Sequence, residues 1–217
     1  MFIGHYAVAL AAKKAAPRTS LGVQMFAAQF FDLLWPIFLL AGLEHVRIAP
    51  GITAFTPLDF TAYPISHSLL TVVAWSALVG GLMFGFAKRG RDAIVVGIVV
   101  LSHWVLDWVT HRPDLPLWPG ESPKVGLGLW NHTAATLAIE FALFASGIWL
   151  YLGVTKARDG VGRWGLAITL LLVVILYLGA AFGPPPPSER ALAFSALGAW
   201  IVPPIFGWID RHRSVAS

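Results

Sequence analysis

Residues 93–109 read AIVVGIVVLSHWVLDWV, and the ionisable side chains in this run are those of His103 and Asp107. A run of this length and apolarity can cross most of the hydrocarbon core of a bilayer as an α-helix. Ionisable groups at that depth are costly unless they are paired, hydrated or bound to a metal. The run therefore predicts a membrane-spanning helix that carries a functional site.

Similar apolar runs recur on both sides of this stretch. The chain is 57% hydrophobic and 12% charged, whereas a soluble domain carries about 25% charged residues. The sequence predicts an all-α, polytopic membrane helical bundle of about six transmembrane helices plus a short N-terminal half-helix. Residues 1–217 form one integral membrane domain in this interpretation, with the site in residues 1–140 and additional spans in 141–217. The other expected spans are Leu21–Leu43, Ile65–Ala87, Thr133–Val154, Trp164–Phe182 and Ala191–Ile209, and the half-helix is Phe2–Ala12.

The basic residues predict the orientation of these spans, because cytoplasmic loops carry an excess of Lys and Arg. Of the 15 Lys and Arg residues, most fall in connections on one side of the expected bundle. We therefore expect a multi-pass protein of the inner (cytoplasmic) membrane with both termini in the cytoplasm. Short basic clusters separated by apolar spans do not form the continuous stripe of a nucleic-acid-binding surface, so no such partner is expected. The basic side holds Lys13, Lys14, Arg18, Lys88, Arg89, Arg91, Lys156, Arg158, Arg163, Arg211 and Arg213, and the far side holds Arg47, Arg112, Lys124 and Arg190.

Three ionisable residues recur at intervals of four around the end of the quoted span. His103, Asp107 and His111 stand at positions i, i+4 and i+8, which lie on one face of a helix. An imidazole and a carboxylate at this spacing can bind the same divalent ion. A single His-x-x-x-Asp pattern is common, so this spacing alone is a weak signal.

Additional ligand-type residues in other apolar segments strengthen the interpretation. His5, Asp32 and His67 each lie in an apolar context, although any one of them could simply hydrogen-bond a neighbouring helix. The chain has no cysteine, so a metal would be held by His and carboxylate groups. At 1.5 Å of rise per residue, these residues fall in the outer half of the bilayer, where the site would open towards the far-side loops. The predicted metal ligands are His5, Asp32, His67, His103 and Asp107.

Further polar residues near the spans are candidates for supporting roles. His111 and His132 are possible interfacial or site residues, and Glu140 is either a carboxylate behind the ligands or an interhelical hydrogen-bonding group. Arg112 could bind an anion such as phosphate, or a lipid headgroup. Ser66 and Thr110 could orient ligand imidazoles, and Glu44 is expected to be a solvated group at the end of a span.

The polar residues of the first half of the chain resemble those of the bacterial inner-membrane metal-dependent hydrolases, a family also described as LexA-binding. The resemblance is carried by Gly4-His5, Asp32, Ser66-His67-Ser68 and Ser102-His103 followed by Asp107. The order of these residues is also similar to that in zinc-dependent phospholipase C and the related single-strand nucleases, which are helical enzymes. The resemblance implies a two-metal set, with Asp107 as the bridging ligand.

The soluble enzymes differ from this chain in two respects. They use a processed N-terminal residue as a ligand, and they have a later His-x-x-x-Glu for a third metal. Here Thr136 stands four residues after His132, and Glu140 follows one turn later. The resemblance therefore implies one or two divalent ions, with Zn²⁺ preferred, and does not support a third.

These observations predict a metal-dependent hydrolase acting on a phosphoester of a lipid or another membrane-associated molecule. Asp107 and Asp32 are the expected catalytic residues, with Asp107 bridging the ions and Asp32 also serving as a base. The main alternative is a transporter or channel in which the His/Asp cluster binds ions or relays protons. A non-catalytic assembly subunit with a structural cluster is a third possibility.

Overall fold

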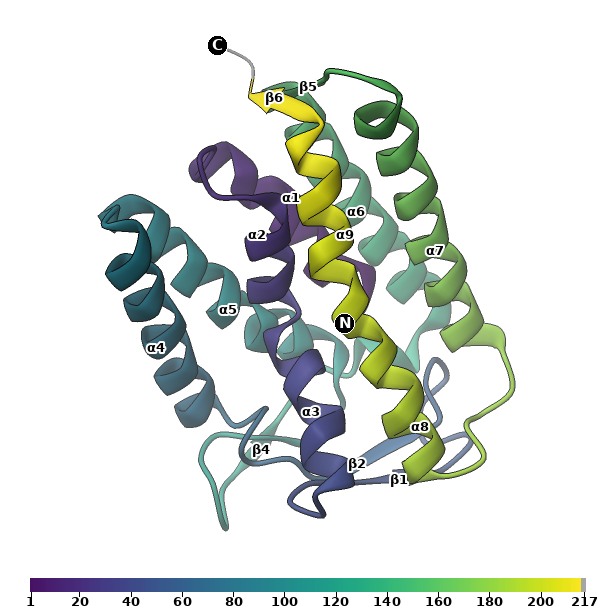
Figure 1. The fold of residues 1–217 in the computed structure, drawn as a ribbon. Coiled ribbons are helices and arrows are strands. Elements are labelled where there is room, and N and C mark those ends of the chain that lie inside the picture. The colour runs from purple at the N-terminus through teal and green to yellow at the C-terminus, as the bar shows by residue number, and fades with distance from the viewer. Residues whose placement is uncertain (216–217) are drawn as a thin grey trace.

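The computed structural model describes residues 1–215, which form a bundle of helices with short strands at its two ends (Figure 1). Five helical stretches are long and apolar enough to cross a membrane, and a sixth crossing results if the bent pair α2 and α3 counts as one. The prediction of an all-α membrane bundle with about six spans is thus confirmed. The helices are α1 (Ile3–Ala15), α2 (Leu21–Ala28), α3 (Phe30–Leu40), α4 (Leu69–Ala87), α5 (Gly90–Thr110), α6 (Thr133–Val154), α7 (Leu166–Phe182), α8 (Glu189–Ala196) and α9 (Val202–Arg211), with short helical turns η1 (Leu129–Asn131), η2 (Val161–Gly165) and η3 (Leu197–Ile201).

Three of the crossings are built from more than one helical piece. A 52° bend separates α2 from α3 at a break between Ala28 and Phe30. The last crossing, Glu189–Arg211, runs through α8, η3 and α9, and one turn of π-helix, η2, leads into α7. The break in the first crossing matters for the site, because a helix end leaves backbone carbonyls without intrahelical partners.

Helix α1 lies inside the bundle, between α6, α2 and α5. It is too short to span a bilayer, but most of its residues are buried. The contact with α6 depends on Gly147, where an added Cβ would lie 2.5 Å from the backbone oxygen of Ala7. A larger residue at position 147 would therefore push α1, and the His5 that it carries, away from the centre of the bundle.

Polar contacts hold α1 at both ends. At its start, the backbone N–H groups of Phe2 and Gly4 donate to Oε2 of Glu140 in α6, over 2.8 and 3.2 Å. At its end, Nζ of Lys13 donates to Oδ2 of Asp210 in α9 over 2.6 Å. These contacts fix the position of α1 along the bundle axis, because a helix terminus is stabilised where its free N–H groups meet a carboxylate.

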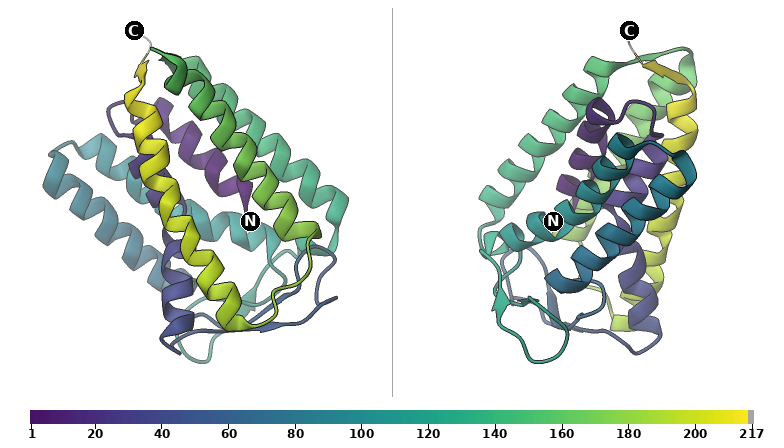
Figure 2. Two further views of the ribbon diagram at one scale, coloured as in Figure 1. Left: turned by 45° about the vertical axis from the view of Figure 1, so that its right-hand side comes forward. Right: turned by 90° about the vertical axis from the view of Figure 1, so that its left-hand side faces the viewer.

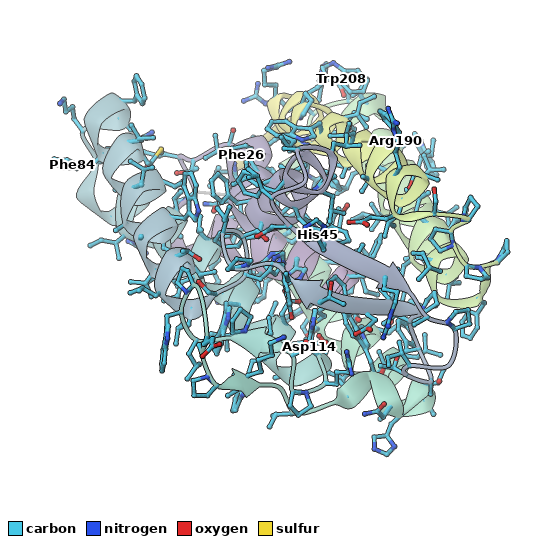
Figure 3. All side chains as sticks on the ribbon, turned by 90° about the horizontal axis from the view of Figure 1, so that it is seen from below. Phe26, His45, Phe84, Asp114, Arg190 and Trp208 are labelled. Atoms are coloured by element: carbon cyan, nitrogen blue, oxygen red, sulfur yellow. The ribbon has the colours of Figure 1, made fainter. Side chains whose placement is uncertain are left out.

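Short strands lie at the two ends of the bundle (Figures 1 and 2). At the end with the long loops, β1 pairs antiparallel with β2, and β3 pairs with β4. Seen from that end, the β1–β2 ribbon crosses the bundle near His45 and Asp114 (Figure 3). β5 and β6 pair at the opposite end. The strands are β1 (His45–Ile48), β2 (Leu58–Ala62), β3 (Leu115–Pro116), β4 (Lys124–Val125), β5 (Thr155–Ala157) and β6 (Arg213–Val215).

The charged connections are divided between the two ends as the sequence predicts. The α1–α2 and α4–α5 connections and the β5–β6 pair lie at one end, and together with the helix ends next to them they carry most of the Lys and Arg residues (Figures 1 and 2). Met1 lies elsewhere: it is buried in the middle of the bundle, where its amino group pairs with Asp107. Which side of the membrane each end of the chain faces stays a prediction.

We expect Arg91 to face the cytoplasm and Pro187 to face the opposite side, because of the distribution of Lys and Arg. Both residues are exposed, and the chain has no native cysteine. In intact inner-membrane vesicles of known orientation, single Arg91→Cys and Pro187→Cys variants should react with an impermeant maleimide from opposite sides. The unsubstituted chain controls for background labelling, and reaction of both variants from one side would contradict the topology.

Candidate metal centre

Asp107 in α5 is the centre of the buried polar cluster. Its Oδ1 lies 3.1 Å from Nε2 of His5 and also pairs with the amino group of Met1. Its Oδ2 lies 3.1 Å from Nε2 of His103 and 3.7 Å from Nε2 of His67. The two oxygens of one carboxylate therefore face two different sets of imidazoles, which is the arrangement required of a bridging ligand.

His103 is oriented by the break between α2 and α3. Its Nδ1 lies 2.8 Å from the backbone oxygen of Ala28, the last residue of α2. A carbonyl oxygen can only accept, so Nδ1 carries the proton and donates. Nε2 is left facing the carboxylate of Asp107. The same break starts α3, whose first turn contains Asp32, and Oδ1 of Asp32 lies 3.7 Å from Nε2 of His103.

His67 is oriented by a carboxylate that was expected to be a solvated surface group. Ser66 Oγ donates to Oε2 of Glu44 over 2.6 Å and lies 2.6 Å from Nδ1 of His67. Glu44 is fully buried and also accepts from the backbone N–H groups of Ile65 and Ser66. Burial raises the pKa of Glu44, whereas its bonds to Ser66 and Ile65 act in the opposite direction. The role of Ser66 matches the prediction, but the burial of Glu44 contradicts it, because the chain folds back over the end of the first crossing.

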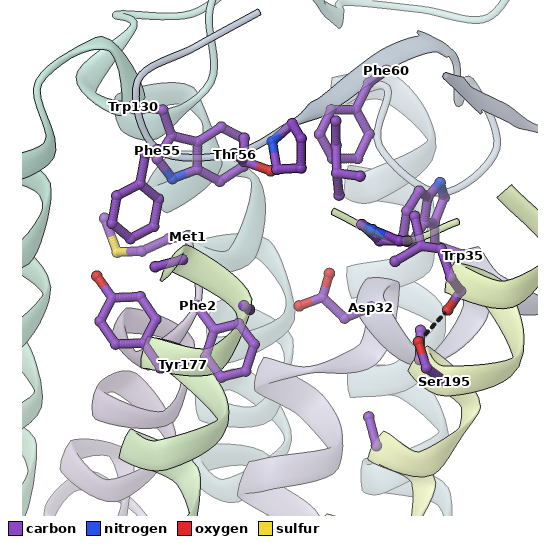
Figure 4. Close-up of a pocket in the computed structure, with 18 of the residues that line it drawn as sticks. Met1, Phe2, Asp32, Trp35, Phe55, Thr56, Phe60, Trp130, Tyr177 and Ser195 are labelled. Atoms are coloured by element: carbon purple, nitrogen blue, oxygen red, sulfur yellow. Dashed lines mark hydrogen bonds between the residues drawn. The ribbon is translucent and has the colours of Figure 1, made fainter. Parts of the chain in front are cut away.

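His5 and Asp32 complete the cluster from two other elements. The rings of His5 and His103 stack with a centroid separation of 3.8 Å and an interplanar angle of 1°. The Nδ1 of His5 is buried and has no hydrogen-bond partner within the described residues. The side chain of Asp32 is 38% exposed although it lies deep in the bundle, because it points into an internal cavity (Figure 4).

The five predicted ligands form two overlapping triads suitable for metal ions. In each triad the potential ligand atoms lie within 4.8 Å of one another. His103 belongs to both triads, but with Nδ1 donating to Ala28 only its Nε2 can bind an ion, so it can serve one of the two triads at a time. Imidazole and carboxylate are the groups that bind Zn²⁺ and similar ions, and ligating His residues usually donate their other N–H to a carbonyl or carboxylate. The first triad is His5, His103 and Asp107, and the second is Asp32, His67 and His103.

The structure places His111 outside the predicted helical face. Helix α5 ends at Thr110, and His111 has an extended backbone with φ −64° and ψ 147°. The reason is Pro113, which cannot continue a helix and disfavours helical geometry in the preceding residue. The Nδ1 of His111 lies 3.0 Å from Oδ1 of Asp114. The ring lines the same cavity as Asp32 but belongs to neither triad.

The structure also pairs Arg112 with acidic residues of the loops. Its Nη2 bonds Asp59 in β2, and its Nε lies 3.2 Å from Oδ2 of Asp114. Asp114 also accepts from the hydroxyl of Tyr63 over 2.8 Å, and burial together with this carboxylate raises the pKa of Tyr63. The anion-binding prediction for Arg112 is therefore not supported. This loop network instead holds Tyr63 and His111 over the cluster.

The remaining candidates do not contact the imidazoles. His132 is exposed and precedes α6. Glu140 caps the start of α1, which corresponds to the interhelical alternative of the sequence analysis. The Thr110 hydroxyl bonds the backbone oxygens of Leu106 and Asp107 in its own helix, over 3.4 and 3.3 Å. Of the two hydroxyls proposed to orient ligands, only that of Ser66 lies at an imidazole.

Ser66→Ala should weaken metal affinity by about 10- to 100-fold, the usual cost of removing a group that orients a ligand. The variant deletes the hydroxyl that joins His67 to Glu44. Ser68→Ala is the matched control, because Ser68 flanks His67 on the other side and its hydroxyl bonds Thr71 instead. Metal titration of the apo-protein measures both variants. Equal affinities in the two variants would show that the bond from Ser66 does not tune the site.

Comparison with known proteins identifies the chain at the family level. The model of a family described as YdjM inner membrane protein matches residues 1–183. This range includes all five residues of the two triads. No curated protein and no solved structure was found to match the chain. The family description names a membrane location and no reaction, so the chemistry has to be inferred from the site.

Proposed function

We propose that this chain, which belongs to the YdjM inner membrane protein family, is a membrane-embedded metal-dependent hydrolase. In this proposal the two triads bind one or two divalent ions, with Zn²⁺ favoured by the His-rich ligand set. The substrate is a phosphoester of a lipid or another membrane-associated molecule. The site lies towards the end of the bundle opposite to the basic connections. We assign the basic connections to the cytoplasmic side of the membrane.

The observation that carries this proposal is the orientation of His103 and His67. Each ring directs Nδ1 to an oxygen away from the cluster and Nε2 to Oδ2 of Asp107. In a neutral imidazole the second nitrogen then carries a lone pair. Two lone pairs facing a carboxylate oxygen repel it, and a cation between them makes the same arrangement favourable. This arrangement supports a cation site formed by the chain's own side chains.

A bound divalent ion would acidify water and offset negative charge on the phosphoryl oxygens. The side chains would supply the remaining chemistry. Asp107 faces His5 and His103 of the first triad and His67 of the second, and Asp32 faces the cavity where a substrate would sit. As water oxygen bonds to phosphorus, Asp32 accepts a water proton. The phosphorus–oxygen ester bond breaks, and the leaving oxygen takes the proton, so one water is consumed for each alcohol and phosphate released.

The test uses protein reconstituted in vesicles of mixed phospholipids and long-chain isoprenoid phosphates. Release of water-soluble phosphate or headgroup should occur in the wild type, stop on addition of a chelator and return with Zn²⁺. The absence of any chelator-sensitive turnover, combined with ion or proton flux that depends on His103, would replace the hydrolase by the transporter.

One observation favours the transporter as a second candidate. Gln24 in α2 is fully buried, and both polar atoms of its amide lack a partner within the described residues. An unpaired buried amide is costly unless water reaches it, and α2 leads from the basic end towards Asp32. A hydrated path along α2 would make flux sensitive to Gln24→Leu, whereas the hydrolase requires no such sensitivity.

A further inference from the structure

A cavity of about 400 Å³ adjoins the His/Asp cluster. At one end it is lined by Asp32, His67, Asp107 and His111. Away from them it extends among aromatic side chains, including Phe2, to the end of α7 and to α8 and η3 (Figure 4). Its volume lies at the lower end of the range of about 300–1,000 Å³ found for small-molecule sites.

The chemistry of the cavity wall changes with distance from the cluster. The charged and imidazole side chains are gathered at the cluster, and no Lys or Arg lines the cavity within residues 1–215. Phe55 and Tyr177, whose rings lie 5.7 Å apart, belong to the apolar part. The apolar part of the wall offers no charged partner to a polar group. A substrate with an apolar portion would instead gain affinity by burying that portion against the wall.

The far part of the cavity lies between two membrane crossings. Gly179 and Ala180 near the end of α7 and Ser195 in α8 line the cavity and are exposed. They belong to the crossings Val161–Phe182 and Glu189–Arg211, so this part of the cavity lies between two segments long and apolar enough to span a membrane. Ala196 and Ala199 are also small cavity-lining residues on the α8–η3 side. The small side chains on both crossings leave room between them.

We propose that this cavity binds a lipid phosphoester that enters sideways from the membrane. Its phosphate lies at the His/Asp cluster, and its hydrocarbon chain passes between α7 and α8 into the bilayer. The limited volume accommodates the headgroup and the first part of one chain, while the remainder of the chain stays among the surrounding lipids. This inference rests on the proposed function for the role of the cluster, but binding of the lipid's hydrocarbon chain can be measured without turnover.

The test uses the full chain in lipid nanodiscs and a long-chain alkyl phosphate that carries a diazirine near the phosphate end. After irradiation, the label should map to residues 177–181 and 192–199. Ala196→Phe and Ala199→Phe should each reduce this labelling at least about tenfold, because a bulky ring fills a space shaped for the chain. Ala145→Phe is the matched control, since Ala145 is exposed on α6 and does not line the cavity. Two separate variants guard against one that fails to fold.

Labelling that is spread evenly over the exposed helices, including α4, and unchanged in both Phe variants would overturn the inference. Hydrolysis of water-soluble p-nitrophenyl phosphate separates this failure from failure of the proposed function. If the soluble ester is cleaved but no label maps to α7 and α8, the hydrolase stands and the proposed binding site for the hydrocarbon chain is wrong. If the label maps as expected but no phosphoester is cleaved, the binding site for the hydrocarbon chain stands and the hydrolase is wrong.

Discussion

His103→Ala and Asp107→Asn should each abolish chelator-sensitive phosphoester hydrolysis while the protein still inserts into the membrane. His103 belongs to both triads, and Asp107 faces three imidazoles. Loss of His103 therefore removes a ligand whichever triad an ion occupies, and loss of the Asp107 carboxylate charge removes the group that faces all three imidazoles. Removing the ion costs several kcal/mol of barrier lowering, which corresponds to a loss of about 10³-fold or more.

Insertion should survive both substitutions, because replacing an ionisable residue inside a span lowers the cost of transfer into the bilayer. The matched control is His132→Ala, which removes an exposed imidazole outside the cluster. Glu140→Gln should have a smaller effect than either ligand variant, since its amide oxygen can still accept from the start of α1. The measurement is initial rate per inserted protein. Full activity in His103→Ala would show that hydrolysis does not use this cluster.

The sequence drew attention to several residues of the cluster because they break a strong apolar pattern. His103 and Asp107 stand in an otherwise apolar run, and Asp32 is the one ionisable residue of its expected span. Ionisable residues are so costly in such segments that their chemistry can be anticipated from position alone. The structure brings these residues together with His5 and His67. Whether they bind metal remains a prediction.

The groups that orient the ligands were harder to foresee. The carbonyl of Ala28 becomes available through the break between α2 and α3. The apolar residues around Ala28 predict one continuous span, so the sequence does not indicate this break. Glu44 looked like a surface group, because it follows an apolar run and precedes a polar loop. Its partner Ser66 lies 22 residues away in the chain. Hydrogen bonds across such distances are set by tertiary packing, which periodicity does not encode.

The errors at the loop end have a similar origin. His111 fits the i+8 position of the helical face, but Pro113 ends the helix before that position is reached. Arg112 looked available for an anion because its partner Asp59 lies 53 residues earlier in the chain. A local pattern can therefore locate an ionisable residue, but it cannot show which distant carboxylate neutralises it.

The central claim is that the two triads supply the ligands of one or two divalent ions, and the membership of His103 in both triads gives that claim a specific signature. His103 belongs to both triads, whereas His5 belongs to one. His103→Ala should therefore reduce the metal content more than His5→Ala, and His132→Ala should leave it unchanged. Metal-ligand affinity depends on the complete ligand set, so each loss should be visible in purified protein.

The most direct measurement is elemental analysis by mass spectrometry of protein purified without chelator, normalised to chain concentration. Wild type should carry one or two divalent ions per chain, His5→Ala fewer, and His103→Ala almost none, with all three proteins folded by circular dichroism. A metal-free wild type that is normally folded, or a metal content in His103→Ala equal to that of wild type, would contradict the account.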